Sequence, residues 1–217
     1  MTTAPARPAG GDAPRSVRFG PLTVRFGPEV IEPRPWTLLQ SRWASAVSSS
    51  LPAGPILELC CGAGHIGLVT AAATGRRLVQ VDANAQACAW AVENATAAGL
   101  AGAVDVRHAR LSEAVRSDER FPLVLADPPY LPTADIGRYA DDPVLAIDGG
   151  RDGLELIAAC AEVAGDHLVG DGLLSVQVRG RAQAREVSEL LCGQWVAQGI
   201  RSAGHDRAVM HLRRSPR

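Results

Sequence analysis

Apolar residues fall in short runs that alternate with amphipathic stretches along most of the chain. The short runs predict strands at residues 55–60, 77–81, 103–107, 123–126, 173–178, 196–202 and 208–213. The amphipathic stretches predict helices at residues 36–48, 65–74, 85–98, 153–168 and 182–194. Strands and helices in alternation are typical of a parallel sheet that is covered by helices on both faces.

The last two predicted strands break this alternation, because only residues 203–207 separate them. So short a connection predicts a hairpin, which places an antiparallel strand in an otherwise parallel sheet. The sequence therefore predicts an α/β fold with a doubly wound, mostly parallel, seven-stranded sheet, helices on both faces and an antiparallel last strand.

The N-terminal segment has a different composition. Residues 1–16 are rich in Pro, Ala and Gly and offer little to bury, so we expect them to be disordered. Residues 17–26 alternate apolar and polar positions around Gly20-Pro21, which predicts a small hairpin. A chain of 217 residues can bury a full core, and we expect residues 17–217 to form one domain.

Composition and charge narrow the classes of function. The formal net charge is −1, so no overall field draws the chain to nucleic acid or to a membrane surface. The five cysteines are odd in number and lack the paired spacing of a disulfide framework or a zinc site. No apolar run approaches the roughly 20 residues of a membrane helix, and the N-terminus lacks a signal-peptide pattern. We expect a cytoplasmic protein without a bound metal.

The tetrapeptide Asp127-Pro128-Pro129-Tyr130 directly follows the apolar run at residues 121–126. Two consecutive prolines cannot continue a strand, so the backbone there is stiff. The Asp127 carboxylate and the Pro128 carbonyl are two acceptors that can take both N–H bonds of a flat NH₂ group, while the Tyr130 ring covers its face. A proline-rich turn with a surface tyrosine is the alternative interpretation.

Residues 56–67 have the pattern of a strand, a glycine turn and a helix. Gly62 and Gly64 allow close approach of the backbone to a ligand, and ligands of such sheets bind beyond the carboxyl ends of the strands. Asp82 ends the next strand, where a carboxylate can accept both hydroxyls of a ribose. With Gly67, the same glycines also match the fingerprint of a dinucleotide-binding turn.

Glu58 favours one of these two cofactors. An ionised carboxylate on this strand would repel a pyrophosphate, and a buried glutamate needs a partner that offsets its desolvation. S-adenosylmethionine (SAM) carries a cationic amino group and a sulfonium, so we predict SAM rather than a dinucleotide. After the third strand, Arg110 stands where an acid often receives the adenine amino group. We expect backbone groups of residues 109–111 and apolar packing to hold the adenine instead. The side chain of Arg110 either contacts the cofactor or is solvated.

Four segments together resemble the class I SAM-dependent methyltransferases, and among them the HemK-type protein-glutamine methyltransferases that modify translation release factors. They are residues 30–37 (VIEPRPWT), 58–67 (ELCCGAGHIG), 127–132 (DPPYLP) and 146–154 (AIDGGRDGL). The resemblance implies methylation of a side-chain amide and the short form of the family, without the N-terminal helical domain. It also implies, more weakly, a small zinc-binding partner protein.

We assign catalysis to Asp127, Pro128 and Tyr130. The assigned cofactor-binding residues are Thr37, Glu58, Leu59, Cys60, Gly62, Gly64, Asp82, Ala83, Arg110, Leu111 and Asp127. His65 opens the first helix after the glycine turn and is a further residue that could touch the cofactor.

Three positions differ from the family pattern, and the first is Arg110, which replaces the acid after the third strand. Asp127 replaces the usual asparagine, as in the amino-methyltransferases of adenine or cytosine in nucleic acids. Trp36 replaces a usual glutamate beside the retained Thr37, and is either a lid over the cofactor or an anchor in the core.

The leading hypothesis is therefore SAM-dependent N-methylation of a glutamine amide in a protein such as a release factor. Methylation of a nucleic-acid base, methylation of a small molecule and SAM binding without turnover are the alternatives. We expect the loop at residues 131–152 to flank the substrate site. Its acids Asp135, Asp141 and Asp142 either bind a basic segment of a partner or are solvated.

Overall fold

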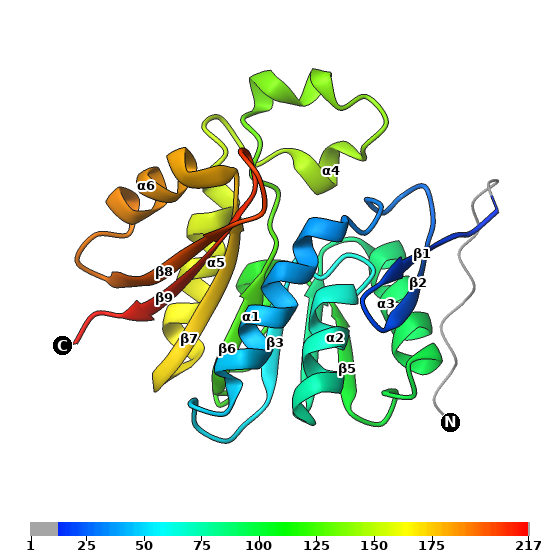
Figure 1. Ribbon diagram of the computed structural model, residues 1–217, viewed down its shortest axis with the longest axis horizontal. Helices are drawn as coiled ribbons and strands as arrows, with labels where there is room; N and C mark the ends of the chain where they lie inside the picture. The colour runs from blue at the N-terminus through cyan, green and yellow to red at the C-terminus, as the bar shows by residue number, and fades with distance from the viewer. Residues whose placement is uncertain (1–12, 217) are drawn as a thin grey trace.

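A seven-stranded sheet runs through the molecule in the order β5-β4-β3-β6-β7-β9-β8 (Figure 1). Neighbouring strands from β5 to β7 pair in parallel, and β9 is antiparallel to both β7 and β8. The computed structural model describes residues 13–216. Its sheet strands are β3 (Ile56–Leu59), β4 (Leu78–Asp82), β5 (Val104–His108), β6 (Phe121–Ala126), β7 (Leu168–Val178), β8 (Trp195–Ser202) and β9 (Ala208–Arg214). The predicted sheet, with its antiparallel last strand, is confirmed.

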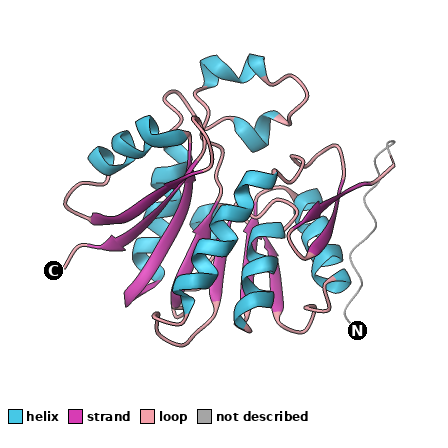
Figure 2. Cartoon of the chain, in the orientation of Figure 1, coloured by secondary structure: helices cyan, strands magenta, loops and turns pink. Residues whose placement is uncertain are grey.

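Helices cover both faces of this sheet, as Figure 2 shows. The longer ones are α1 (Leu38–Ser48), α2 (His65–Thr74), α3 (Ala85–Ala97), α5 (Glu155–His167) and α6 (Gly180–Leu190). Side chains of β3 alternate between the two faces, because successive residues of a strand point in opposite directions. Leu57 and Leu59 pack in a core cluster with α5 and α6, whereas Ile56 packs in a second cluster with α1, α2 and α3.

The N-terminal hairpin consists of β1 (Arg15–Phe19) and β2 (Leu22–Phe26). Phe19 and Phe26 of this hairpin are fully buried in the second cluster. Their burial explains why this short N-terminal segment folds against the domain. The predicted disordered tail at residues 1–16 is wrong at its C-terminal end, since Arg15 and Ser16 pair with Phe26 and Arg25. Residues 1–12 of that tail lie outside the described residues.

Two element boundaries differ clearly from the prediction. Strand β7 begins at Leu168, directly after α5, and is therefore longer than the predicted strand at 173–178. Helix α6 ends at Leu190 instead of residue 194, and Gly193 follows with a φ of 80° that L side chains rarely adopt. These ends depend on local backbone geometry, which hydrophobic periodicity does not encode.

The segment predicted as a long loop at residues 131–152 contains two short helices, η3 (Thr133–Arg138) and α4 (Val144–Ile147). Two further short helices are η1 (Pro35–Thr37), before α1, and η2 (Leu111–Glu113), after β5. We call residues 131–152 the lobe. In Figure 1 the lobe stands above the edge of the sheet where the parallel strands end. None of the described helices is long and apolar enough to cross a membrane.

Candidate active site

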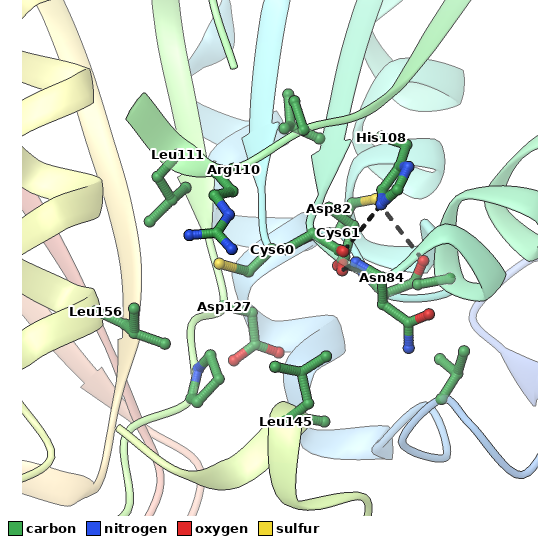
Figure 3. A pocket seen from close by; sticks show the side chains of 18 of the residues that line it. Cys60, Cys61, Asp82, Asn84, His108, Arg110, Leu111, Asp127, Leu145 and Leu156 are labelled. Carbon is green, nitrogen blue, oxygen red and sulfur yellow. Dashed lines mark hydrogen bonds between the residues drawn. The ribbon is translucent and has the colours of Figure 1, made fainter. Parts of the chain in front are cut away.

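A cavity of about 880 Å³ opens at the carboxyl ends of β3, β4 and β6. Figure 3 shows side chains of several elements converging on it. Of the predicted cofactor residues, Cys60, Gly62, Asp82, Ala83, Arg110, Leu111 and Asp127 line this cavity. The prediction that the cofactor site lies beyond the ends of these strands therefore agrees with the position of a large cavity.

The turn between β3 and α2 has an unusual backbone. Cys60, Gly62 and Gly64 have φ values of 57°, 53° and 81°, all in the left-handed region. Glycine adopts this region freely, but at Cys60 it is strained for an L residue, and such strain concentrates at functional sites. A side chain at Gly64 would also collide with Gln80, because a Cβ atom there would lie 2.7 Å from the amide nitrogen. The glycines thus shape the cavity wall.

Glu58 does not reach the cavity, which corrects the expected contact with the cofactor's cationic groups. It is 2% exposed and lies below the glycine turn. Its Oε1 accepts the backbone N–H of Gly67 at 2.9 Å, and Gln80 donates to its Oε2 at 2.6 Å. Burial raises the pKa of Glu58 to about 8, so the carboxyl is mostly protonated at neutral pH. Protonation and the two hydrogen bonds from Gly67 and Gln80 offset the cost of burying the carboxyl group, so no cationic partner is required.

Asp82 stands at the end of β4, and its carboxyl connects two turns. Its Oδ2 accepts from the N–H of Gly62 at 2.8 Å, and its Oδ1 accepts from the N–H of Asn84 at 2.9 Å. Each oxygen keeps a further lone pair, so the carboxylate can still accept the two hydroxyls of a ribose. Burial raises the pKa of Asp82, while both backbone hydrogen bonds oppose that shift.

The wall that follows β5 mixes the apolar Ala109 and Leu111 with the polar or charged His108, Arg110, Ser112 and Glu113. Its apolar part is continued by α5. Leu111 from η2 and Leu156 from α5 face the cavity, and Arg110 extends into it in Figure 3. Such a wall suits the flat face of an adenine ring. Leu59 and Gly64, also predicted as cofactor residues, do not line either cavity; Leu59 is fully buried in the core.

Asp127 stands where this first cavity meets a second one of about 320 Å³. Both cavities are lined by Ile31, His65, Asp127 and Ala146. Burial raises the pKa of Asp127 to about 7. No hydrogen bond from the described part of the chain to its carboxyl is found, which leaves the group free to bind a ligand.

The second cavity holds the remainder of the predicted catalytic motif. Pro128 and Tyr130 line it, and burial raises the pKa of the Tyr130 hydroxyl. Thr37, which we expected near the cofactor, lies here instead, with its Oγ1 3.3 Å from His65 Nε2. Burial lowers the pKa of His65 to about 3, so this histidine is neutral at physiological pH.

Two glycines, Gly149 of the lobe and Gly153 just after it, pack against the turn at residues 127–130. A Cβ atom at Gly149 would lie 2.7 Å from the Pro129 carbonyl, and one at Gly153 would collide with the Tyr130 carbonyl. Gln183 of α6 donates its amide N–H to that same Tyr130 oxygen at 2.8 Å. The glycine-rich segment at residues 146–154 and the tetrapeptide at 127–130 therefore form one packed unit.

Ion pairs fix the lobe over the second cavity. Asp142 accepts from Arg34 at 2.5 Å, and Asp135 accepts from Arg179 at 2.7 Å. Because both acids are already paired, they are not available to bind a basic segment of a partner protein. That binding was one of the two roles we expected for them.

Trp36 lines the second cavity, under the guanidinium of Arg207. It is therefore not the core anchor that was one of its two expected roles. Arg179 and Arg207 were missed, because loops of the distant C-terminal strands bring them to the site and no local pattern marks them.

Comparison with known proteins agrees with this geometry. Residues 43–139 match the family model described as "Methyltransferase small domain". A release factor glutamine methyltransferase of Mycobacterium tuberculosis is 34% identical over 175 residues, which cover 75% of this chain and 55% of that protein. The release factor glutamine methyltransferase of Agrobacterium fabrum is 30% identical over 212 residues, covering 90% of this chain and 71% of that protein. The chain belongs to the HemK-type glutamine methyltransferases.

This HemK-type chain spans about half the length of the curated relatives first matched, between 49% and 58%. Solved structures share its class I methyltransferase fold at low identity. The ribosomal protein L11 methylase of Lactobacillus delbrueckii subsp. bulgaricus has a TM-score of 0.66 at 14% identity, covering 88% of this chain and 84% of that one. The hMettl16 catalytic domain, solved with an RNA hairpin, has a TM-score of 0.69 at 12% identity, covering 89% and 75%.

SAM is the cofactor of these methyltransferases, and the residues of the first cavity fit it. Asp82 offers carboxylate oxygens to ribose hydroxyls, and Leu111 and Leu156 offer an apolar wall to adenine. The Asp127 carboxyl lines the same cavity without a hydrogen-bond partner in the described chain, and its ionised form would attract a sulfonium. Within residues 13–216, no group of three or more His, Cys, Asp or Glu residues could hold a metal ion.

Replacing Glu58 with glutamine is expected to change how stability depends on pH. Below about pH 4.5 the carboxyl is protonated in both states, whereas up to about pH 8 only the folded state keeps the proton. The free energy of unfolding of the wild type therefore falls as pH rises through this window. Glu58→Gln removes this contribution and should be more stable than wild type by about 2 kcal/mol or more at pH 8.

Urea unfolding at pH 5 and pH 8 measures this difference. Glu186→Gln, on the exposed face of α6, serves as the matched control and should follow the wild type at both values. If the free energy of unfolding changed equally between pH 5 and pH 8 in wild type and in Glu58→Gln, Glu58 would be ionised in the folded chain.

Gly153→Ala is expected to lower the free energy of unfolding by about 1–3 kcal/mol, because alanine is strained at positive φ and its methyl group collides with Tyr130. The φ of Gly153 is 77°. Gly137→Ala, in the neighbouring lobe, is the control, since nothing lies within 4 Å of a Cβ atom there. Thermal unfolding compares the two; matching midpoints would contradict the packing described here.

Proposed function

We propose that this chain transfers a methyl group from SAM to the side-chain amide nitrogen of a glutamine in a protein of the release factor class. The observation that carries the proposal is the position of Asp127, whose carboxyl lies between a large cavity that fits SAM and a second, smaller one. Relatives named for this reaction, including a ribosomal protein uL3 glutamine methyltransferase of Bordetella pertussis at 29% identity, support the choice of acceptor.

The residues of the second cavity suit a flat amide group. An amide nitrogen is a poor nucleophile, because its lone pair is delocalised into the carbonyl. Acceptors on both N–H bonds favour a pyramidal nitrogen and direct its lone pair toward the first cavity. We assign these acceptors to the Asp127 carboxylate and the Pro128 carbonyl, with the Tyr130 ring stacked on the amide plane.

SAM supplies an electrophilic methyl group on its sulfonium. When the N–C bond forms, the S–C bond to the methyl group would break and the sulfur would leave as a neutral thioether. The nitrogen becomes cationic and has to lose one proton. Asp127 is suited to take that proton, because burial raises its pKa to about 7, close to physiological pH. The neutral His65 beside it adds no positive charge that would compete for the carboxylate.

Charge at the second cavity favours a protein over a nucleic acid as acceptor. Its lining combines Arg34, Arg179 and Arg207 with the acids Glu32, Asp127, Asp142 and Asp206. Positive charge is thus not in excess there, and the whole chain carries −1. Binding to a phosphate backbone relies on a net basic surface, which neither of these provides.

The direct test offers SAM and three acceptors to the purified chain, namely a release factor, an adenine-containing oligonucleotide and a free glutamine amide. Mass spectrometry should find one added methyl group on a glutamine of the release factor. A release factor in which that glutamine is replaced by alanine is the control. Methylation of the oligonucleotide alone, weakened steeply by salt, would favour the base-methylation alternative and overturn the proposal.

The same assay tests whether a partner is needed. Methylation by the purified chain alone would show that no small activating protein is required. A release factor as acceptor would suit our proposal that the chain acts in the cytoplasm, where translation occurs.

The rate of methylation is expected to depend on pH through Asp127. The ionised carboxylate accepts the N–H, so kcat/KM of the wild type should rise with pH and level off above about pH 7. In Asp127→Asn the neutral amide does not titrate, and kcat/KM should be flat between pH 6 and about pH 8. Asp127→Ala should lower kcat by about a hundredfold or more.

Calorimetry of SAM binding to each variant separates loss of catalysis from loss of the cofactor. An Asp127→Asn enzyme with the pH profile of the wild type would assign the titrating group elsewhere.

A further inference from the structure

Of the three arginines that line the second cavity, two are already neutralised. Arg34 pairs with Asp142 and Arg179 pairs with Asp135, and both pairs hold the lobe. For the Arg207 guanidinium, no ion pair or hydrogen bond is found within the described chain. Arg207 therefore brings an unpaired cation with free N–H donors to the cavity mouth.

Trp36 holds this cation in position. The guanidinium carbon of Arg207 lies 3.5 Å from the centroid of the Trp36 ring. A planar guanidinium on an aromatic face is attracted by the ring quadrupole, and its N–H bonds remain available at the edge of the plane. The stack orders a long, exposed side chain before a ligand arrives, which lowers the entropic cost of binding.

The hairpin between β8 and β9 explains why Arg207 lies at the site. Strand β8 runs parallel to β7 and β9 runs back, so the turn at residues 203–207 lies at the same sheet edge as the catalytic turn. In Figure 1 the tip of this hairpin lies near the base of the lobe. The turn is held there by close packing, since a Cβ atom at Gly180 would collide with the His205 carbonyl.

We propose that Arg207 is a substrate-binding residue that donates hydrogen bonds to main-chain carbonyl oxygens of the acceptor protein, next to the methylated glutamine. A glutamine whose amide reaches Asp127 through the second cavity leaves its backbone at the mouth, where Arg207 stands. Carbonyl oxygens, which are neutral, suit the mouth of the second cavity, because the acids that line this cavity already offset its arginines. The inference rests on the proposed function and adds the residue that positions the acceptor segment.

The experiment measures methylation of an acetylated, amidated glutamine peptide that contains no acidic residue. Arg207→Ala should raise KM for the peptide about tenfold, because charge-assisted hydrogen bonds are lost. The kcat value and the dissociation constant of SAM should stay within about twofold of wild type, because Asp127 and the first cavity are unchanged. Arg207→Lys, with a point charge instead of a planar fork, should recover only part of the loss.

Arg214→Ala is the matched control. Arg214 is also exposed and is the last residue of β9 in the same hairpin. Its guanidinium carbon lies 5.4 Å from the centroid of the Trp195 ring, but it lines neither cavity. Its kinetic constants should match those of the wild type. Trp36→Leu should raise KM as Arg207→Ala does, and the double variant should be no worse than either, because both changes remove one interaction.

The outcomes separate the two proposals. A wild-type chain that binds SAM but methylates no glutamine peptide overturns the proposed function and this inference together. A wild-type chain that methylates the peptide while Arg207→Ala keeps its KM overturns the inference alone. An equal rise of KM in Arg207→Ala and Arg214→Ala would also overturn it, because the effect would then be a general loss of positive charge.

Discussion

The close packing of two glycines against a proline turn is the contact on which the candidate site depends. Gly149 and Gly153 lie so near the backbone of Pro129 and Tyr130 that neither position has room for a side chain. This contact joins the end of the central strand β6 to the lobe that covers the sheet edge. It places Asp127 between two cavities with its carboxyl unpartnered, and the rigidity of the turn keeps that group aimed at whatever occupies them.

Burial then gives two carboxyl groups of the same region different roles. Glu58 lies beneath the glycine turn, stays mostly protonated at neutral pH and accepts hydrogen bonds from Gly67 and Gln80. Asp127 opens on the cavities and titrates near pH 7, where it can exchange a proton with a ligand. Desolvation raises both pKa values, and access to the cavities separates the structural acid from the candidate catalytic one. Arg34 and Arg179 hold the lobe over the second cavity, at whose edge Asp127 lies.

Local pattern was sufficient to predict most elements of the fold. The apolar run before Asp127, the glycine turn before His65 and the short link at residues 203–207 each encode their structure within a few positions, through burial, positive φ and chain length. The same reasoning missed the helices of the lobe and the full extent of β7, because these elements are stabilised by contacts with distant segments. Hydrophobic periodicity carries no information about such contacts.

The sequence by itself determined the type of chemistry, because an acid, two prolines and a tyrosine after a buried strand form an acceptor site in any fold that preserves them. It also predicted that Asp82 and the glycine turn lie beyond the strand ends, where the first cavity opens. Only the tertiary structure decided that Glu58 is buried in the core and that Thr37, Trp36 and Arg207 line the second cavity. The physical reason is that strand alternation and the packing of remote loops set the direction of each side chain, and neighbouring residues along the chain do not specify it.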